Sequence, residues 1–88
     1  MPYIIQDQRK FLEKPLSRLT EIVNNLPLTA GELNYIITKL VHAWIGGHGY
    51  CYDSFNSAIG ILECVKQELY RRKISPYEDI KIKENGDV

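Results

Sequence analysis

The sequence predicts an all-α fold, a small three- to four-helix bundle with an extended C-terminal tail. Three segments, at about residues 15–26, 30–45 and 54–73, repeat apolar residues at the spacing of a single helix face. The stretches "NNLP" and "GGHG" separate these segments, and such Gly-, Pro- and Asn-containing stretches are typical of turns. Because the connections are short, consecutive helices should lie mostly antiparallel. We therefore expect one helical domain over residues 1–88, with the tail at residues 76–88.

The composition is that of a globular protein and disfavours some classes of function. Hydrophobic residues make up 44% and charged residues 25% of the chain, which is the range of globular proteins. The formal net charge is zero, which disfavours a general nucleic-acid-binding protein. A chain of 88 residues buries only about two-thirds of its unfolded surface, and oligomerisation is a common remedy for the thin stability that results. We therefore expect a homo-oligomer.

The sequence carries no membrane or export signal that we can identify. The start, "MPYIIQDQRK", lacks a basic segment followed by an apolar one, and no apolar run approaches the roughly 18 residues of a membrane span. The two cysteines, Cys51 and Cys64, are expected to be free thiols. Together these features predict a soluble, cytoplasmic protein.

The first expected helix covers residues 15–26. Before it, Asp7 is placed to cap a helical turn in "QRKFLEK". Pro15 should break that turn, and proline suits the first turn of the helix that follows. The apolar stripe of this helix consists of Leu16, Leu19, Ile22, Val23 and Leu26.

The central helix, at residues 30–45, has the clearest signals. Thr29 and Glu32 have the spacing of a capping box, in which each side chain bonds to the other residue's backbone N–H. Gly46 and Gly47 are expected to end the helix, because glycine accepts the left-handed conformation of a C-cap. Its core-facing positions are Leu33, Ile36, Ile37, Leu40, Val41 and Trp44.

The last helix is expected at residues 54–73, capped by Asp53 or Ser54. It should end at Ser75, because a residue before proline avoids the helical conformation. Its core stripe consists of Phe55, Ala58, Ile59, Leu62, Val65 and Leu69. Glu68 and Arg72 have the spacing of an exposed ion pair on this helix.

The tail alternates apolar and charged residues in "DIKIKE", which is the period of a strand. A lone strand is not stable, so the tail must lie on the bundle, pair with another chain or be disordered. Its net charge of −2 is opposite to the +2 of the rest of the chain. We expect it to fold back over the bundle, or onto a neighbouring subunit, with its acidic side chains near Arg71, Arg72 or Arg9.

Small side chains form a stripe on the last helix, at Ser57, Gly60 and Cys64. Glycine inside a helix costs about 0.5–1 kcal/mol relative to alanine, and close helix approach often offsets that cost. The stripe therefore indicates packing within the monomer, an oligomer interface, or a ligand against the Gly60 backbone.

Two groups of Tyr, Arg, Lys and Asn side chains are candidates for a ligand- or partner-binding surface. Tyrosine and arginine together suit a protein surface or the flat base and the phosphates of a nucleotide. The alternative is a solvated helix face. The candidates are Asn34, Tyr35 and Lys39 on the central helix, and Tyr70, Arg71, Arg72 and Tyr77 near the end of the chain.

Catalytic, cofactor and metal sites are not expected. The loop "GGHGY" lacks the Lys-Ser/Thr that completes a phosphate-binding loop. Among the four possible zinc ligands, only His48 and Cys51 have a suitable spacing; His42 and Cys64 do not. No nucleophile motif accompanies the cysteines. The sequence therefore predicts a protein that is not an enzyme, with no cofactor and no metal.

The segments "MPYI", "GELNYIITKLVH", "AIGILECVKQELYRR" and "PYEDIKIKENGDV" occur in this order along the chain. In this arrangement the sequence resembles a family of small phage and bacterial proteins that carries only a domain-of-unknown-function label. The resemblance covers nearly the whole chain and implies no activity. It does imply that the tail is a regular feature of these proteins.

Two functions fit these observations. The first is a non-enzymatic, small oligomeric binding protein that binds or sequesters a small anionic, nucleotide-like ligand. The second is a protein–protein interaction adaptor or regulator with no small-molecule ligand. Neither requires a membrane, and net neutrality disfavours nucleic acid as the partner.

Overall fold

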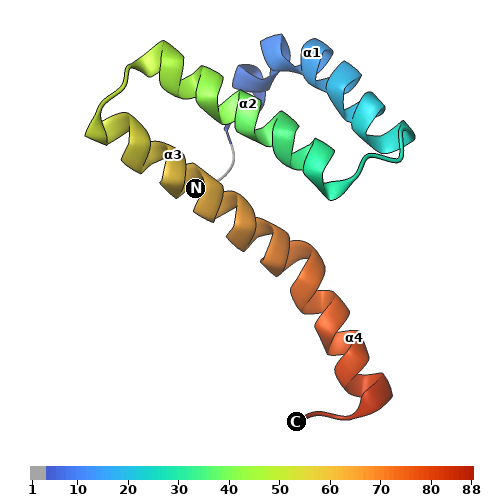
Figure 1. Cartoon of the computed structure of the whole chain (residues 1–88). Coiled ribbons are helices and arrows are strands. Elements are labelled where there is room, and N and C mark those ends of the chain that lie inside the picture. The colour runs from blue at the N-terminus through green and yellow to red at the C-terminus, as the bar shows by residue number, and fades with distance from the viewer. Residues whose placement is uncertain (1–3) are drawn as a thin grey trace.

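The computed structural model describes residues 4–88, and every regular element in that range is helical (Figure 1). Helix α1 spans Gln6–Asn25, α2 spans Ala30–His48 and α3 spans Tyr52–Leu69. A π-helical turn, η1 at Tyr70–Ile74, leads directly into α4 at Ser75–Asn85. The predicted all-α fold is confirmed, but the predicted extended tail is wrong, since only residues 86–88 follow the last helix.

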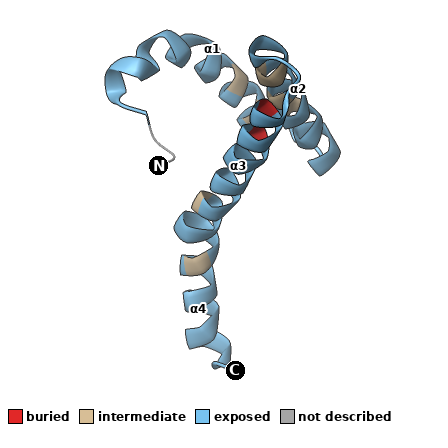
Figure 2. Ribbon diagram, turned by 90° about the vertical axis from the view of Figure 1, so that its left-hand side faces the viewer, coloured by how far each residue is buried: buried red, intermediate tan, exposed pale blue. Residues whose placement is uncertain are grey.

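Helix α1 begins nine residues before the predicted start and runs through Pro15. Its N-cap is Ile5, which makes no side-chain cap bond, so the predicted cap at Asp7 is wrong. Asp7 lies instead in the first turn, where a carboxylate is favourable, and its side chain is 3.3 Å from Lys10 Nζ. Proline inside a helix loses one hydrogen bond and commonly kinks the helix. Figure 2 accordingly shows α1 as bent and continuous.

The capping box of α2 is confirmed. The Glu32 backbone N–H donates to Thr29 Oγ1 at 3.1 Å, and the Thr29 N–H donates to Glu32 Oε1 at 2.9 Å. The predicted end at Gly46 and Gly47 is wrong, because both residues lie inside the helix. The helix ends instead at Gly49, which has φ 104° and donates its N–H to the Ile45 carbonyl at 2.7 Å.

Helix α3 begins two residues before the predicted start, with Cys51 at the N-cap. Asp53 and Ser54, the predicted caps, therefore lie in its first turn, and the Cys51 side chain makes no cap bond. The Ser54 hydroxyl is buried in that turn and lies 3.5 Å from Cys51 Sγ.

The helix continues past Ser75 and Pro76, so the predicted end at Ser75 is wrong. Proline has no N–H, and inside an α-helix its ring clashes with the carbonyl four residues earlier, here that of Arg72. The π turn relieves this conflict because it shifts the hydrogen-bond ladder by one residue: the Ser75 N–H donates to the Tyr70 carbonyl, five residues back. Downstream of the turn, α4 resumes the α-helical pattern.

The helices form an open arrangement in which α3 packs against α2 while α4 extends away from α1 and α2 (Figures 1 and 2). The radius of gyration is 16.6 Å, whereas a compact domain of this length has about 12 Å. Among the described residues, only Ala58 and Ser54 are buried, both in α3. The tail therefore does not fold back over its own bundle.

Candidate interaction surface

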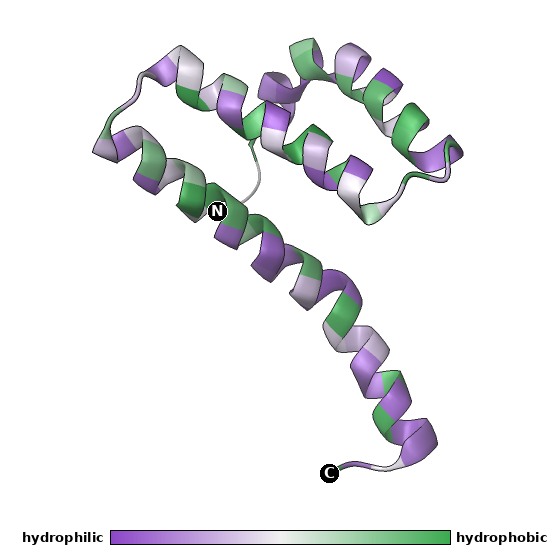
Figure 3. Ribbon diagram, in the orientation of Figure 1, coloured by the Kyte–Doolittle hydropathy of each residue, from purple (hydrophilic) through white to green (hydrophobic). Residues whose placement is uncertain are grey.

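Most large apolar side chains of the described chain are on its surface. The accessible area is 7971 Å², whereas a compact globular protein of this mass exposes about 5,300 Å². The difference of about 2,700 Å² is comparable with the roughly 1,000–2,500 Å² or more that each chain buries in a permanent oligomer. Figure 3 shows apolar residues along α1 and α3 in regions that Figure 2 marks as exposed.

An open groove of about 710 Å³ runs along the end of α3 and the π turn. Its lining includes Gly60 and Cys64, which the sequence places at an oligomer interface, and Tyr70 and Arg71, which it places at a ligand site. The structure thus brings together two sets of residues that sequence reasoning treated separately. The third member of the small-residue stripe, Ser57, is exposed on α3 one turn before Gly60.

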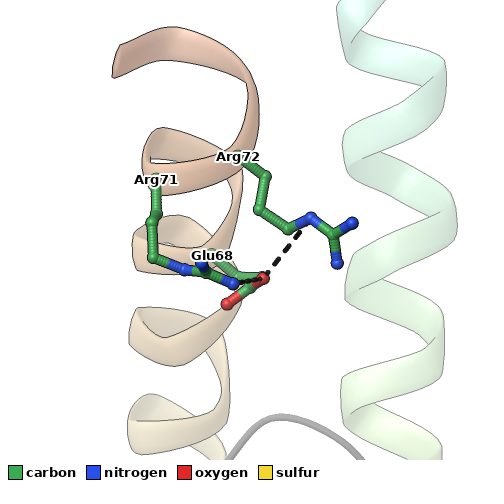
Figure 4. Close-up of polar contacts among 3 residues, drawn as sticks. All are labelled: Glu68, Arg71 and Arg72. Carbon is green, nitrogen blue, oxygen red and sulfur yellow. Dashed lines mark hydrogen bonds and ion pairs between the residues drawn. The ribbon is translucent and has the colours of Figure 1, made fainter. Parts of the chain in front are cut away.

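Two arginines share one carboxylate beside this groove (Figure 4). Arg71 Nη2 donates to Glu68 Oε1 at 2.6 Å, and Arg72 Nε lies 3.8 Å from the same oxygen. The Glu68 side chain is only 21% exposed, against 67% for Arg71, so the carboxylate lies beneath the more exposed guanidinium groups. Sequence reasoning identified the pair with Arg72 but missed the one with Arg71, which has the equally suitable i, i+3 spacing.

A second polar contact bridges the π turn. The Tyr70 hydroxyl donates to Glu78 Oε2 at 3.0 Å, which links the end of α3 to α4. Sequence reasoning missed Glu78, because the contact requires a helix that continues through Pro76. Further along α4, Lys81 Nζ lies 5.6 Å from the centre of the Tyr77 ring, within the range of a cation–π contact.

The carboxylate of Glu78 raises the pKa of Tyr70, first through the hydrogen bond and then through its charge. We expect Glu78→Ala to lower the pKa of Tyr70 toward the ordinary tyrosine value of about 10. The check is a titration of the ¹³Cζ resonances of labelled tyrosine, with Tyr70 assigned from Tyr70→Phe. Glu84→Ala, which removes a carboxylate one helix turn and a half further along α4, is the control.

The raised pKa also sets a direction for the pH dependence. The folded state holds the Tyr70 proton more tightly than the unfolded chain does. The contribution of this contact is therefore complete below about pH 10 and is lost as the pH rises through the raised pKa. An identical titration curve for Tyr70 in the wild type and in Glu78→Ala would contradict the contact.

The candidates on α2 lie apart from this groove. The Thr38 hydroxyl donates to Asn34 Oδ1 at 3.1 Å, and Lys39 Nζ lies 5.7 Å from the centre of the Tyr35 ring. Tyr35 lines a different groove, beside the N-terminal turn of α2. The seven predicted binding residues are therefore divided among three elements, with three on α2, three in η1 and Tyr77 on α4. Of these seven, only Tyr70 and Arg71 line the groove.

Nothing in residues 4–88 forms a group of three or more His, Cys, Asp or Glu side chains that suits a metal ion. His48 Nδ1 lies 2.8 Å from the Trp44 carbonyl, and its ring stacks on the Trp44 ring. Cys51 and Cys64 are both free thiols. The side-chain hydrogen bond with Ser54 lowers the pKa of the Cys51 thiol. Among the described helices, none combines the length and the apolar character needed to cross a bilayer.

The whole chain, residues 1–88, matches the family model described as "Domain of unknown function (DUF6899)". The chain belongs to this family. The predicted membership of an uncharacterised family is thus confirmed. No curated protein and no solved structure matches this DUF6899 chain.

Proposed function

We propose that this DUF6899 protein is a non-enzymatic homo-oligomer that binds a small anionic, nucleotide-like ligand beside the groove at the end of α3. As the sequence resemblance implies, we place it among phage or bacterial proteins. The lack of an export or membrane signal in the sequence supports the cytoplasm as its location. The observation that carries the proposal is the excess of about 2,700 Å² of accessible surface over a compact protein of this mass. A single chain that leaves so much apolar surface in water has too little core to be stable alone.

The ligand class follows from the side chains of η1, the π turn that follows α3. Arg71, Arg72 and Lys73 carry three positive charges, against the one negative charge of Glu68. Arginine binds phosphate through two parallel hydrogen bonds. Glu68 pairs with both guanidinium groups, and Arg71 lines the groove. The Tyr70 ring, also at the groove, offers a flat face on which a nucleobase can stack.

A specific observation favours a second candidate, an adaptor that binds a protein. Glu63 and Glu68 also line the groove, so its walls carry both signs of charge. Acidic walls oppose a small anion, whereas a protein surface can offer complementary groups to both signs. The two candidates share the oligomer and differ in what occupies the groove.

Native mass spectrometry of the purified full-length protein tests the oligomer and retained ligands together. We expect a multiple of the 10.2 kDa chain mass, with extra mass where a ligand is retained. Melting curves with mono-, di- and cyclic dinucleotides then test the ligand class. A nucleotide at 100 times its dissociation constant adds about 2.7 kcal/mol, which for a domain of this size raises Tm by on the order of 10 °C.

Arg71→Ala should reduce the nucleotide-induced shift in Tm by at least half, because it removes a charge-assisted phosphate contact. Arg18→Ala, which removes an exposed arginine from α1, is the matched control and should leave the shift unchanged. An oligomer whose Tm does not respond to any nucleotide would overturn the ligand and leave the adaptor. A monomer at micromolar concentration would overturn the oligomer itself.

A further inference from the structure

We infer that a second copy of this chain packs antiparallel on one apolar face of the continuous helix formed by α3, η1 and α4. The inference rests on the homo-oligomer of the proposed function and names the surface that joins the chains. The surface, called here the long-helix face, consists of Phe55, Ile59, Leu62, Leu69, Ile74 and Tyr77.

The π turn makes this face continuous. In α3, Phe55, Ile59, Leu62 and Leu69 follow one another at steps of four, three and seven residues, which keep them on one side of an α-helix. The next step, from Leu69 to Ile74, is five residues, which in an α-helix would rotate the side chain about 140° away. In a π turn, with its i→i+5 bonds, five residues complete roughly one turn.

Ile74 therefore returns to the side of Leu69, and Tyr77 follows three residues later on the same side. The step from Leu69 to Ile74 is one residue longer than the usual four. It falls in the π turn, where the backbone hydrogen bonds also span one residue more than in an α-helix. Pro76 explains why the ladder shifts, and the shift aligns α4 with α3.

The long-helix face is uncovered in the single chain. Its six side chains are between 37% and 67% exposed. Helix α2 packs along one edge of this face. Ala58, at that edge, is buried, and Ile61 lies beyond it, beside Leu40 and Trp44 of α2. The groove lies on another side of the helix. Its residues Gly60 and Cys64 follow Ile59 and Leu62 by one and two residues, and residues so spaced do not share a helix face. A second copy on the long-helix face therefore leaves the groove open to a ligand.

The exposed area favours a second copy as the occupant. A stable interface of standard size buries about 800 Å² on each partner, well within the excess of about 2,700 Å² that each chain exposes. Every copy carries the same long apolar face. A two-fold axis can therefore pair the two faces in a closed dimer that covers both at once.

The distribution of charge along the helix favours an antiparallel over a parallel pair of chains. Residues 63–74 carry four cations and two carboxylates, a net charge of +2, whereas residues 75–88 carry two cations and four carboxylates, a net charge of −2. A parallel pair aligns each segment with its own copy and brings like charges together. In an antiparallel pair centred on the long-helix face, near residue 66, residues 75–88 lie opposite residues 44–57 of the partner. That segment carries one carboxylate and no Lys or Arg, so the acidic segment no longer faces its own copy.

The surface is tested with Ile59→Asp and Leu69→Asp in the full-length chain, measured by sedimentation velocity at several concentrations. Each variant should weaken self-association by at least about 100-fold, because it places an unpaired charge in an apolar interface. Asn56→Asp adds the same charge to an exposed α3 position outside the face and should associate like the wild type. Circular dichroism verifies that each variant keeps its helices.

The direction is tested by the distance between spin labels at Asn85→Cys, with Cys51 and Cys64 changed to serine. In a parallel pair the two labels lie about 10–15 Å apart, since packed helices are 8–10 Å apart. In an antiparallel pair centred on the face they lie about 50 Å or more apart, because each residue adds about 1.5 Å along the helix and the two labels lie on opposite sides of the two-fold axis. A short distance would overturn the antiparallel arrangement.

The outcomes separate the two proposals. If the wild type is an oligomer and both aspartate variants remain the same oligomer, the long-helix face is not the interface, and the homo-oligomer of the proposed function stands. If the wild type is a monomer, both the inference and the oligomer are overturned. Dissociation of both variants, with Asn56→Asp unchanged and a long label distance, is the expected result.

Discussion

Ala58→Asp is expected to disrupt the packing of α3 on α2 and to lower the free energy of unfolding by about 3 to 5 kcal/mol. Ala58 is 4% exposed and lies with Ile61 against Leu40, Val41 and Trp44 of α2. A carboxylate at this position would be buried among apolar side chains with no cation to pair with it. For a domain of this size, 3 kcal/mol corresponds to a fall in Tm of roughly 12–24 °C.

The measurement is a thermal melt followed by circular dichroism at fixed protein concentration, with Ala43→Asp as the matched control. Ala43 is an exposed position inside α2, so the same substitution there should cost only the difference in helix propensity, about 0.7 kcal/mol or less. Equal falls in Tm for the two variants would show that the α2–α3 contact does not carry the fold.

Local signals predicted the structure well where neighbouring residues alone determine it. The bonds between Thr29 and Glu32 depend on a spacing of three residues, and both are present. The helical periodicity of the three central segments likewise depends only on nearby residues, and all three segments are helical. These features need no information on how the helices pack.

Pro15 and Pro76 misled the prediction for a physical reason. The rule that proline breaks a helix describes the loss of one hydrogen bond and a local clash. Helix α1 continues through Pro15, and a π turn precedes Pro76. The sequence shows where the conflict lies but does not show which of these solutions the chain adopts.

The strand-like alternation of the tail misled the prediction for a second reason. Ile80 and Ile82 alternate with charged residues, but a strand requires a partner, and the neighbouring Lys81, Lys83 and Glu84 are good helix formers. Lys81 and Glu84 have the i, i+3 spacing of a helical ion pair, and Lys81 Nζ lies 3.1 Å from Glu84 Oε2. That spacing was the available signal for α4.

The candidate site was predictable in part. Gly60, Cys64 and Arg71 reach one groove because their spacing places them along one side of a continuous helix. The separation of Tyr35 from that groove depends on how α2 and α3 pack, which the spacing of residues within one helix does not encode.

The degree of burial connects the sequence to the oligomer. An unfolded chain of this mass exposes about 14,800 Å², so a single folded chain with 7971 Å² buries only about half of its surface. A compact chain of this length should bury close to two-thirds. Closing that gap requires contacts that the chain does not make with itself. We therefore expect the free energy of unfolding to rise with protein concentration.

The end of α2 provides a sharp prediction, because the same substitution at two nearby glycines should have opposite effects. Gly49 has φ 104° and ψ 151°, a conformation that only glycine adopts readily, so Gly49→Ala should lower the free energy of unfolding by about 1–3 kcal/mol. Gly47 lies inside α2, where an added Cβ would meet no atom within 4 Å. Gly47→Ala should therefore raise the free energy of unfolding by about 0.5–1 kcal/mol.

Urea unfolding of both variants at one protein concentration distinguishes the two possible ends of the helix. If α2 ended at Gly46 and Gly47, as their Gly-Gly pattern predicts, alanine at residue 47 would strain the turn and destabilise the protein. Because the helix instead continues to His48, the strain should appear only at residue 49. If Gly47→Ala destabilised the protein and Gly49→Ala had no effect, α2 would end at Gly46 and Gly47.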